Sequence, residues 1–305
     1  MQLVQWTLFI DMLGYRELNG SIDSDASAQE FMEFMNDNRK ILDFTNAPHI
    51  VEQYKNNNEF NLYEFYDISH CFVSDSLIIT YKPKEAVELD NFDKRLMHSA
   101  NALFIISMRL QTFIFHCFAE KGLFLRGGVS NKYCYIKESI AVGEGLIEAY
   151  EAESSLAKYP RILIHPSVEK DTGLLEKIDF LGKKMYEGKG ILQKDDTDGR
   201  LFIDHLGYAI ATVDKSIPMI KISAMVQPKR HAAHLQNVQL LVQRHAEQIE
   251  RKLDELSTRI NNASDNGDEC KKLKSVLTKF EWLRKYHNSK VAANPWLKGR
   301  LVQEG

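Results

Sequence analysis

The sequence predicts an α+β fold: a ferredoxin-like core with a mixed or antiparallel sheet and helices on one face, followed by a two-helix hairpin. Two observations predict it. Strand-forming and amphipathic stretches follow one another as β-α-β-β-α-β-β-α-β, which is not the strict alternation of a doubly wound parallel sheet. From about residue 228 onward, apolar residues recur at steps of three and four, the period of a helix. We therefore predict two domains, residues 1–227 and 228–305.

The first element is a strand over Leu3–Ile10, an apolar run that stops at Asp11. Residues 23–44 then have the apolar spacing of an amphipathic helix. Three residues at its start can serve as the N-cap: Ser24, Asp25 and Ser27. The polar residues 52–61 predict a loop after this helix.

A β-hairpin, a long helix and another strand come next. β-Branched and aromatic residues over 62–82 flank Ser74-Asp75-Ser76, which predicts two antiparallel strands joined by a tight turn. Residues 90–121 have a long helical pattern that ends at Gly122. Residues 123–136 predict a strand that contains a glycine pair.

The remaining elements of the first domain are shorter. Residues 139–159 predict a short strand leading into a helix, and 160–166 predict a strand bounded by prolines. We expect a helix near 174–180 and strands near 201–203 and 208–212.

The C-terminal section predicts two helices separated by the polar residues 261–269. Their apolar seam packs either on the main domain or on a second copy of the chain. The seam residues are Leu235, Val238, Val242, Ile249, Leu253, Leu256 and Ile260 in the first helix, and Leu273, Val276, Leu277, Phe280 and Leu283 in the second.

The composition is that of a soluble globular protein, with 44% hydrophobic and 27% charged residues. The formal net charge is −3 and no long Lys/Arg block is present, which argues against nucleic-acid binding. The widely spaced cysteines fit neither a disulfide frame nor a zinc site. No secretory signal is recognisable, and the apolar residues 102–118 are interrupted by Arg109, as in a core helix. We expect a cytoplasmic protein that does not bind membranes.

Two aspartates stand at positions that suit metal binding. Asp11 follows the first strand, and Asp75 lies in the turn of the central hairpin. If these strands are neighbours, both carboxylates emerge at one edge of the sheet, where they could bind Mg²⁺ or Mn²⁺. Each aspartate taken alone also fits an ordinary turn or helix cap.

Arg126 lies inside an apolar strand, directly before Gly127 and Gly128. An arginine at such a position either meets an anion or lies on the solvent face of the sheet. The glycine pair allows a ligand or another backbone to come close.

Four short motifs follow one another along the chain: FIDMLGY, FVSDS, LRGGVS and VGEGLIEAYEAE…YPRI. In this order they resemble the class III nucleotidyl cyclases, and among these the bacterial pyrimidine cyclases of the Pycsar antiviral system. The resemblance spans about Leu3 to Ile164 and excludes the C-terminal helices.

The resemblance implies a class III cyclase core in a homodimer with active sites at the subunit interface. A nucleoside triphosphate would be converted to its 3′,5′-cyclic monophosphate and pyrophosphate with two divalent cations, Mn²⁺ or Mg²⁺. The residues it implicates are Asp11 and Asp75 as metal-binding carboxylates, the Met12 carbonyl as a further ligand, the amides around Leu13 and Gly14 at the triphosphate, and Arg126 at the phosphates.

The chain departs from this family's adenylyl cyclases at the base-reading position. They have a lysine shortly before the second carboxylate, whereas Cys71 is nearest to that position here. An adenine-specific cyclase is therefore disfavoured. Tyr66, Cys71 and Phe72 are candidates to shape a smaller base pocket, and each also fits the protein core.

A second departure concerns the asparagine and arginine that act on the ribose and the transition state in adenylyl cyclases. Residues 140–160 contain neither residue type. Charge neutralisation would fall on Arg126, on a lysine such as Lys132, or on the partner chain.

The favoured hypothesis is a pyrimidine nucleotide cyclase, with UTP preferred over CTP from the family alone, whose product is an antiviral second messenger read by a separate effector. A metal-dependent phosphohydrolase is an alternative, although Leu13 stands where D-x-D enzymes have a second aspartate. A non-catalytic nucleotide-sensing module would fit the missing asparagine and arginine.

Overall fold

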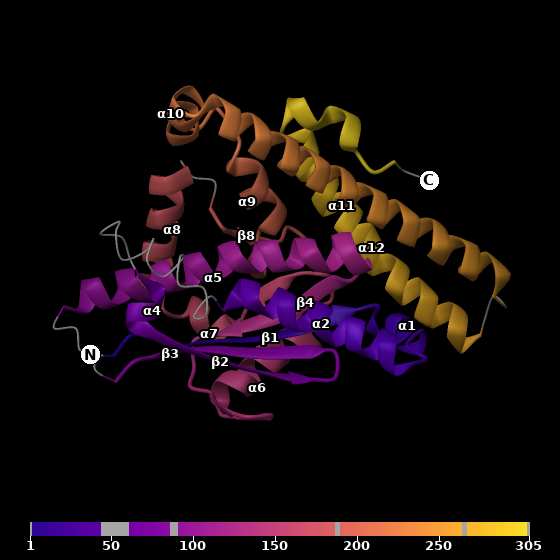
Figure 1. Ribbon diagram of the computed structural model, residues 1–305, viewed down its shortest axis with the longest axis horizontal. Coiled ribbons are helices and arrows are strands. Elements are labelled where there is room, and N and C mark those ends of the chain that lie inside the picture. The colour runs from indigo at the N-terminus through magenta and orange to yellow at the C-terminus, as the bar shows by residue number, and fades with distance from the viewer. Residues whose placement is uncertain (1, 44–60, 86–90, 187–189, 264–266, 304–305) are drawn as a thin grey trace.

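The computed structural model describes residues 2–43, 61–85, 91–186, 190–263 and 267–303. Its architecture is mixed α+β, with a mostly antiparallel seven-stranded sheet and helices on both sides (Figure 1). The strands lie in the order β2-β3-β1-β4-β7-β9-β8. Their bounds are Trp6–Leu13 (β1), Tyr66–Val73 (β2), Ser76–Pro83 (β3), Phe124–Ser130 (β4), Ile162–Ile164 (β7), Leu192–Lys194 (β8) and Leu201–Ile203 (β9). The predicted α+β class is confirmed.

Strand β1 lies in the middle of the antiparallel part of the sheet. It pairs antiparallel with β3 on one side and with β4 on the other, and β2 pairs antiparallel with β3 at the edge. Among the strands in the described residues, the one parallel pair is β4 with β7. Side chains alternate between the two faces along each strand, so β1 presents one set of residues to each helical layer.

Two long helices cover the first face of the sheet: α2 (Asp25–Leu42) and α5 (Phe92–Lys121). Of the three N-cap candidates, Ser24 caps α2, and its side chain accepts a hydrogen bond from the Ser27 amide. Helix α5 ends at Gly122, which has a φ of 65°. By length and composition α5 is long and apolar enough to cross a membrane. However, 67% of its most apolar 18-residue stretch is buried inside the protein, as in a core helix.

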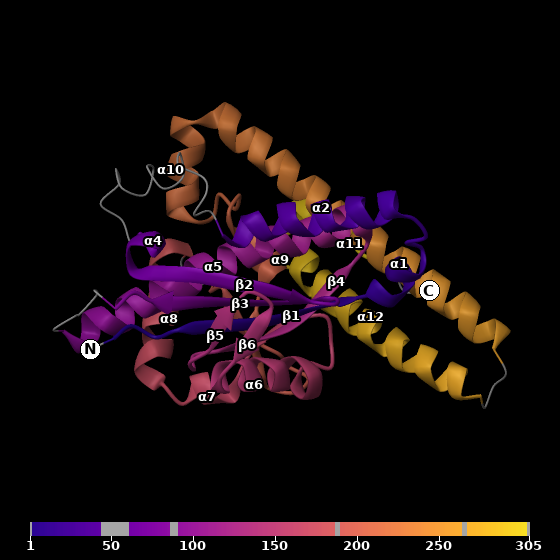
Figure 2. The same cartoon turned by 60° about the horizontal axis from the view of Figure 1, so that its bottom comes forward.

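The opposite face is covered by α6 (Glu144–Glu151), a π-helical turn η1 (Ala152–Leu156) and the small hairpin β5–β6 (Tyr135–Lys137 and Ile140–Val142) (Figure 2). The prediction of helices on one face only is therefore wrong. The glycine pair is the reason. A Cβ on Gly128 would collide with the Ala149 carbonyl oxygen and the Ala152 side chain, so glycine lets this layer pack directly on β4.

Three predicted boundaries also differ from the structure. Strand β1 does not stop at Asp11 but continues to Leu13. Residues Leu62–Phe65 form a helical turn, α4, before β2 begins. Residues 208–212 are not a strand. They belong mostly to helix α9 (His205–Ala211), whose N-cap Asp204 accepts a hydrogen bond from the Gly207 amide. The predicted loop over 52–61 lies outside the described residues except for Asn61.

The other helices are short or peripheral. They are α1 (Tyr15–Gly20), α7 (Pro166–Glu169), α8 (Thr172–Tyr186), α10 (Pro218–Val226) and the 3₁₀ segment η2 (Pro295–Arg300). Helix α8 includes the predicted helix near 174–180 and packs against α5.

The C-terminal hairpin consists of α11 (Pro228–Asn262) and α12 (Asp268–Ala292). Of the two packing alternatives, the structure shows the first: the seam faces the main part of the same chain, where α11 contacts α5 and both helices contact α9. The Phe280 ring meets the Phe124 ring edge-on at 5.4 Å, so α12 also touches the sheet. The division at residue 227 remains a prediction, because the hairpin shares one hydrophobic core with the rest of the protein.

Three buried histidines lie between the hairpin and the main domain: His205, His245 and His287. His287 Nε2 donates to the Arg300 carbonyl, and its Nδ1 lies 2.9 Å from Nδ1 of His245. Burial lowers the pKa of all three, and lowers the pKa of His205 to about 4.

The free energy of unfolding should therefore fall in mild acid. Between pH 6.5 and 4 the unfolded chain protonates His205 while the folded protein does not, so acid favours the unfolded state. His205 alone should account for a loss of about 2 kcal/mol between pH 7 and pH 5. Urea unfolding at both pH values would measure this loss, and His205→Asn should reduce it. An equal loss in that variant would contradict the assignment to His205.

Candidate functional site

Asp11 lies on the face of β1 that is covered by α6 and η1. Trp6, Leu8, Ile10 and Met12 point into the core beneath α5, and the Trp6 indole donates to the Ser99 carbonyl there. The alternate residues point the other way, since the Phe9 ring contacts the Tyr150 ring of α6 at 5.2 Å. Asp11 is on this second side, with 17% of its side chain exposed.

The turn between β2 and β3 brings Asp75 next to Asp11. Asp11 pairs with Ser76 in the sheet register, so Asp75 stands one residue beyond that pair. Ser74, the other turn residue, has a φ of 57°, a left-handed conformation that reverses the chain in two residues. Burial raises the pKa of Asp11, and the neighbouring Asp75 carboxylate raises it further. The predicted convergence of the two aspartates is thus present in the structure.

Arg126 stands directly opposite Asp11 on β4. Its Nη2 lies 3.4 Å from Asp11 Oδ2 and forms a closer ion pair with Glu153 of η1. The arginine therefore meets anions supplied by the chain itself, and does not lie on a solvent face. Its Nε is buried without a hydrogen-bond partner among the described residues.

Glu153 is a site residue that the sequence did not indicate. It is 3% exposed, and burial raises its pKa while Arg126 lowers it. Within the motif EAYEAES nothing in the sequence distinguishes this glutamate from Glu148 and Glu151. Its burial depends on how closely η1 approaches β4, which only the three-dimensional packing reveals.

Lys279 of α12 is the second unanticipated residue. It is half-buried, and burial lowers its pKa, with a further lowering from Arg126 and opposite effects from Asp11 and Glu153. The C-terminal hairpin therefore adds a cation to the cluster. Lys132, the lysine suggested by the sequence, lies instead in a different cavity with Glu144 and Glu148.

The turn after β1 borders this cluster. Gly14 has a φ of 95°, which a side chain would strain, and its carbonyl begins α1. Leu13 and Gly14 line a cavity of about 220 Å³ together with residues of both hairpin helices. Met12 buries its side chain in the core, so only its backbone is available to the site.

The three candidates for a base pocket lie in different places. Cys71 is on the same sheet face as Asp11, packed against Ile78, Cys134 and Ile136. Phe72 and Tyr66 belong to the opposite, α5-facing core. Tyr66 is 1% exposed and donates its hydroxyl to the Val4 carbonyl, at the end of β2 remote from Asp75. The structure therefore brings neither Tyr66 nor Phe72 to the face that carries the cluster.

The oxygen donors of the site suit a hard divalent cation. In the described part of the chain, no group of three or more His, Cys, Asp and Glu side chains is arranged to hold a metal ion. The Asp75 carboxylate is close enough to raise the pKa of Asp11, a repulsion that a cation would offset. Mg²⁺ and Mn²⁺ sites commonly use one or two carboxylates with phosphate oxygens and water, so this pair fits such an ion.

No protein-family model matches the chain, and no curated protein matches it either. Among solved structures, one that matches is titled "Crystal structure of the guanylyl cyclase Cya2". It is 11% identical, with 65% of this chain and 88% of that chain covered and a TM-score of 0.29. A TM-score this low establishes no common fold, so the site geometry must support any functional conclusion.

Proposed function

We propose that this protein is a metal-dependent nucleotidyl cyclase that converts UTP, and less readily CTP, to the 3′,5′-cyclic monophosphate and pyrophosphate. The observation that carries the proposal is the meeting of Asp11 and Asp75 opposite Arg126. The strand order β2-β3-β1-β4, with α2 and α5 in the crossovers, supports it as well, because this is the split β-α-β order of a ferredoxin-like cyclase core.

Asp11, Asp75 and the Met12 carbonyl would hold two Mn²⁺ or Mg²⁺ ions. When bound, these ions supply Lewis-acid activation of the ribose 3′-hydroxyl and neutralise phosphate charge. The 3′-oxygen then bonds to the α-phosphorus, the bond from that phosphorus to the pyrophosphate oxygen breaks, and the hydroxyl proton passes to water. The attack is intramolecular, so the chain chiefly positions the ribose and stabilises charge.

Arg126 would contribute to that stabilisation by moving from Glu153 to the phosphates. Its half-buried guanidinium already forms ion pairs with the carboxylates of Asp11 and Glu153. Its Nε has no hydrogen-bond partner in the described residues. The amides around Leu13 and Gly14 would face the triphosphate. Cys71, on the same sheet face as Asp11, remains a candidate near the base.

A homodimer is supported by exposed apolar residues on the side of the sheet that carries Asp11. Large hydrophobic side chains gather on β5–β6 and α6, where a partner would bury them. They are Tyr133, Tyr135, Ile140, Val142, Ile147 and Tyr150. A second subunit there would lie beside the site and could complete it.

The pyrimidine preference, the antiviral second-messenger role, the separate effector and the cytoplasmic location rest on the sequence resemblance. They belong to the same proposal, and no nucleic-acid or membrane partner is included in it.

Incubating the purified protein with each of the four triphosphates and Mn²⁺ tests the proposal. We expect cyclic UMP and pyrophosphate as the main products, identified by mass, with less product from CTP and least from ATP. Release of inorganic phosphate would favour a phosphohydrolase instead. Triphosphate binding that needs no cation and yields no product would favour a nucleotide-sensing module.

A further inference from the structure

The C-terminal hairpin lies against the turn where the triphosphate is expected. The cavity at Leu13 and Gly14 is closed on its other side by Leu256 of α11 and by Lys279 and Phe280 of α12. Figures 1 and 2 both show α12 passing beside α1 and the end of β1. The cavity has a volume of about 220 Å³, which is below the roughly 300–1,000 Å³ typical of a pocket that holds a whole ligand. It is therefore large enough for part of a ligand.

Two lysines line this cavity, and they differ in their partners. Lys252 of α11 is engaged in ion pairs with Glu17 and Glu255, both 3.1 Å away. In the part of the chain that the structure describes, Lys279 takes part in no ion pair, although Asp11 and Glu153 influence it at longer range. Lys279 is therefore the cation that remains available to an anionic ligand.

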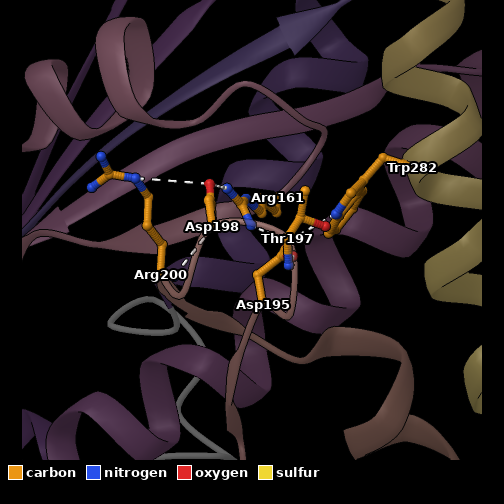
Figure 3. Close-up of polar contacts among 6 residues, drawn as sticks. All are labelled: Arg161, Asp195, Thr197, Asp198, Arg200 and Trp282. Atoms are coloured by element: carbon orange, nitrogen blue, oxygen red, sulfur yellow. Dashed lines mark hydrogen bonds and ion pairs between the residues drawn. The ribbon is translucent and has the colours of Figure 1, made fainter.

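Lys279 is held in position by the next turn of its own helix. Trp282, three residues later, donates its indole N–H to Asp195 at 2.8 Å, and its ring stacks on Tyr159 at 5.2 Å. Asp195 also pairs with Arg161, which is fully buried (Figure 3). This cluster ties α12 to the turn between β8 and β9, so Lys279 does not depend on a flexible segment for its placement.

We propose that Lys279 binds the polyphosphate of the substrate, which makes the C-terminal hairpin part of the active site of its own subunit. The inference rests on the proposed cyclase function and adds a phosphate-binding residue from outside the region that resembles cyclases. It assigns a source of positive charge in place of the arginine that residues 140–160 lack. Half-burial strengthens the expected contact, since an ammonium in a partly desolvated site interacts more strongly with phosphate.

Calorimetric titration with inorganic tripolyphosphate in the presence of Mn²⁺ tests the inference without requiring turnover. Lys279→Met should weaken binding by about 10- to 100-fold, the loss expected for one charge-assisted hydrogen bond, and should raise KM for UTP in the same direction. Lys279→Arg should restore most of the affinity. Lys272→Met, an exposed position on the same helix, is the matched control and should bind as the wild type does.

The outcomes separate the two proposals. If the wild type forms cyclic nucleotide while Lys279→Met keeps wild-type affinity and KM, this inference is wrong and the cyclase function stands. If no triphosphate is cyclised but tripolyphosphate binding still depends on Lys279, the cyclase function is wrong and the phosphate site stands. A melting temperature for Lys279→Met within about 2 °C of the wild type would confirm that lost binding is not lost folding.

Discussion

Asp75→Asn is expected to lower the rate of cyclic nucleotide formation by about 100-fold or more, because it removes one of the two carboxylates proposed to hold the metal ions. In the absence of metal, the Asp75→Asn variant should be no less stable to unfolding than the wild type. Asp75 raises the pKa of Asp11, so the two charges repel each other and removing one relieves that repulsion. Asparagine also suits a tight turn.

Two measurements check this prediction together. The rate of cyclic nucleotide formation from UTP with Mn²⁺ should fall strongly in the variant. Mn²⁺ should raise the melting temperature of the wild type, and this rise should largely disappear in the variant. Asp67→Asn is the matched control, since Asp67 is an exposed aspartate at the other end of the same hairpin, opposite Lys82. A wild-type rate in Asp75→Asn would remove the aspartate pair from the mechanism.

The aspartate pair could be predicted because short-range patterns determine it. An apolar strand, a hairpin with a two-residue turn and a strand carrying an arginine are each recognisable within about ten residues. Alternation then places Asp11 and Arg126 on one face once their strands are neighbours. The extent of β1 beyond Asp11 was missed because a polar residue inside a strand resembles a strand end.

Glu153 and Lys279 could not be predicted, because long-range packing gives both of them their environment. Glu153 is buried only because Gly128 lets the α6–η1 segment lie on β4. Lys279 belongs to α12. The apolar seam of this helix predicts that the helix is packed, but does not predict which surface it packs against. The wrong prediction of a strand at residues 208–212 has a local origin, because a short apolar run fits a buried helix as well as a strand. The N-cap Asp204 favours the helix.

The buried Arg161–Asp195 pair should be the most sensitive point of the hairpin's attachment. Arg161 is 1% exposed and pairs with Asp195 and Asp198, while Asp195 also accepts from Trp282 and from the Thr197 amide. Asp195→Asn keeps the shape of the side chain but leaves the Arg161 charge with one partner, nearer the surface. Breaking a buried pair on one side typically costs about 3–5 kcal/mol of unfolding free energy.

Urea unfolding of Asp195→Asn should therefore show a loss of about 3 kcal/mol or more, whereas Asp196→Asn, at the adjacent exposed position, should lose less than about 0.5 kcal/mol. The double variant Arg161→Met/Asp195→Asn should lose less unfolding free energy than the sum of the losses in the two single variants. The reason is that Arg161→Met removes the charge that Asp195→Asn leaves unpaired. Additive losses would mean that the two residues stabilise the protein independently. Where the folded variant can still be assayed, a loosened α12 should also weaken tripolyphosphate binding, since Trp282 and Lys279 lie on the same face of that helix.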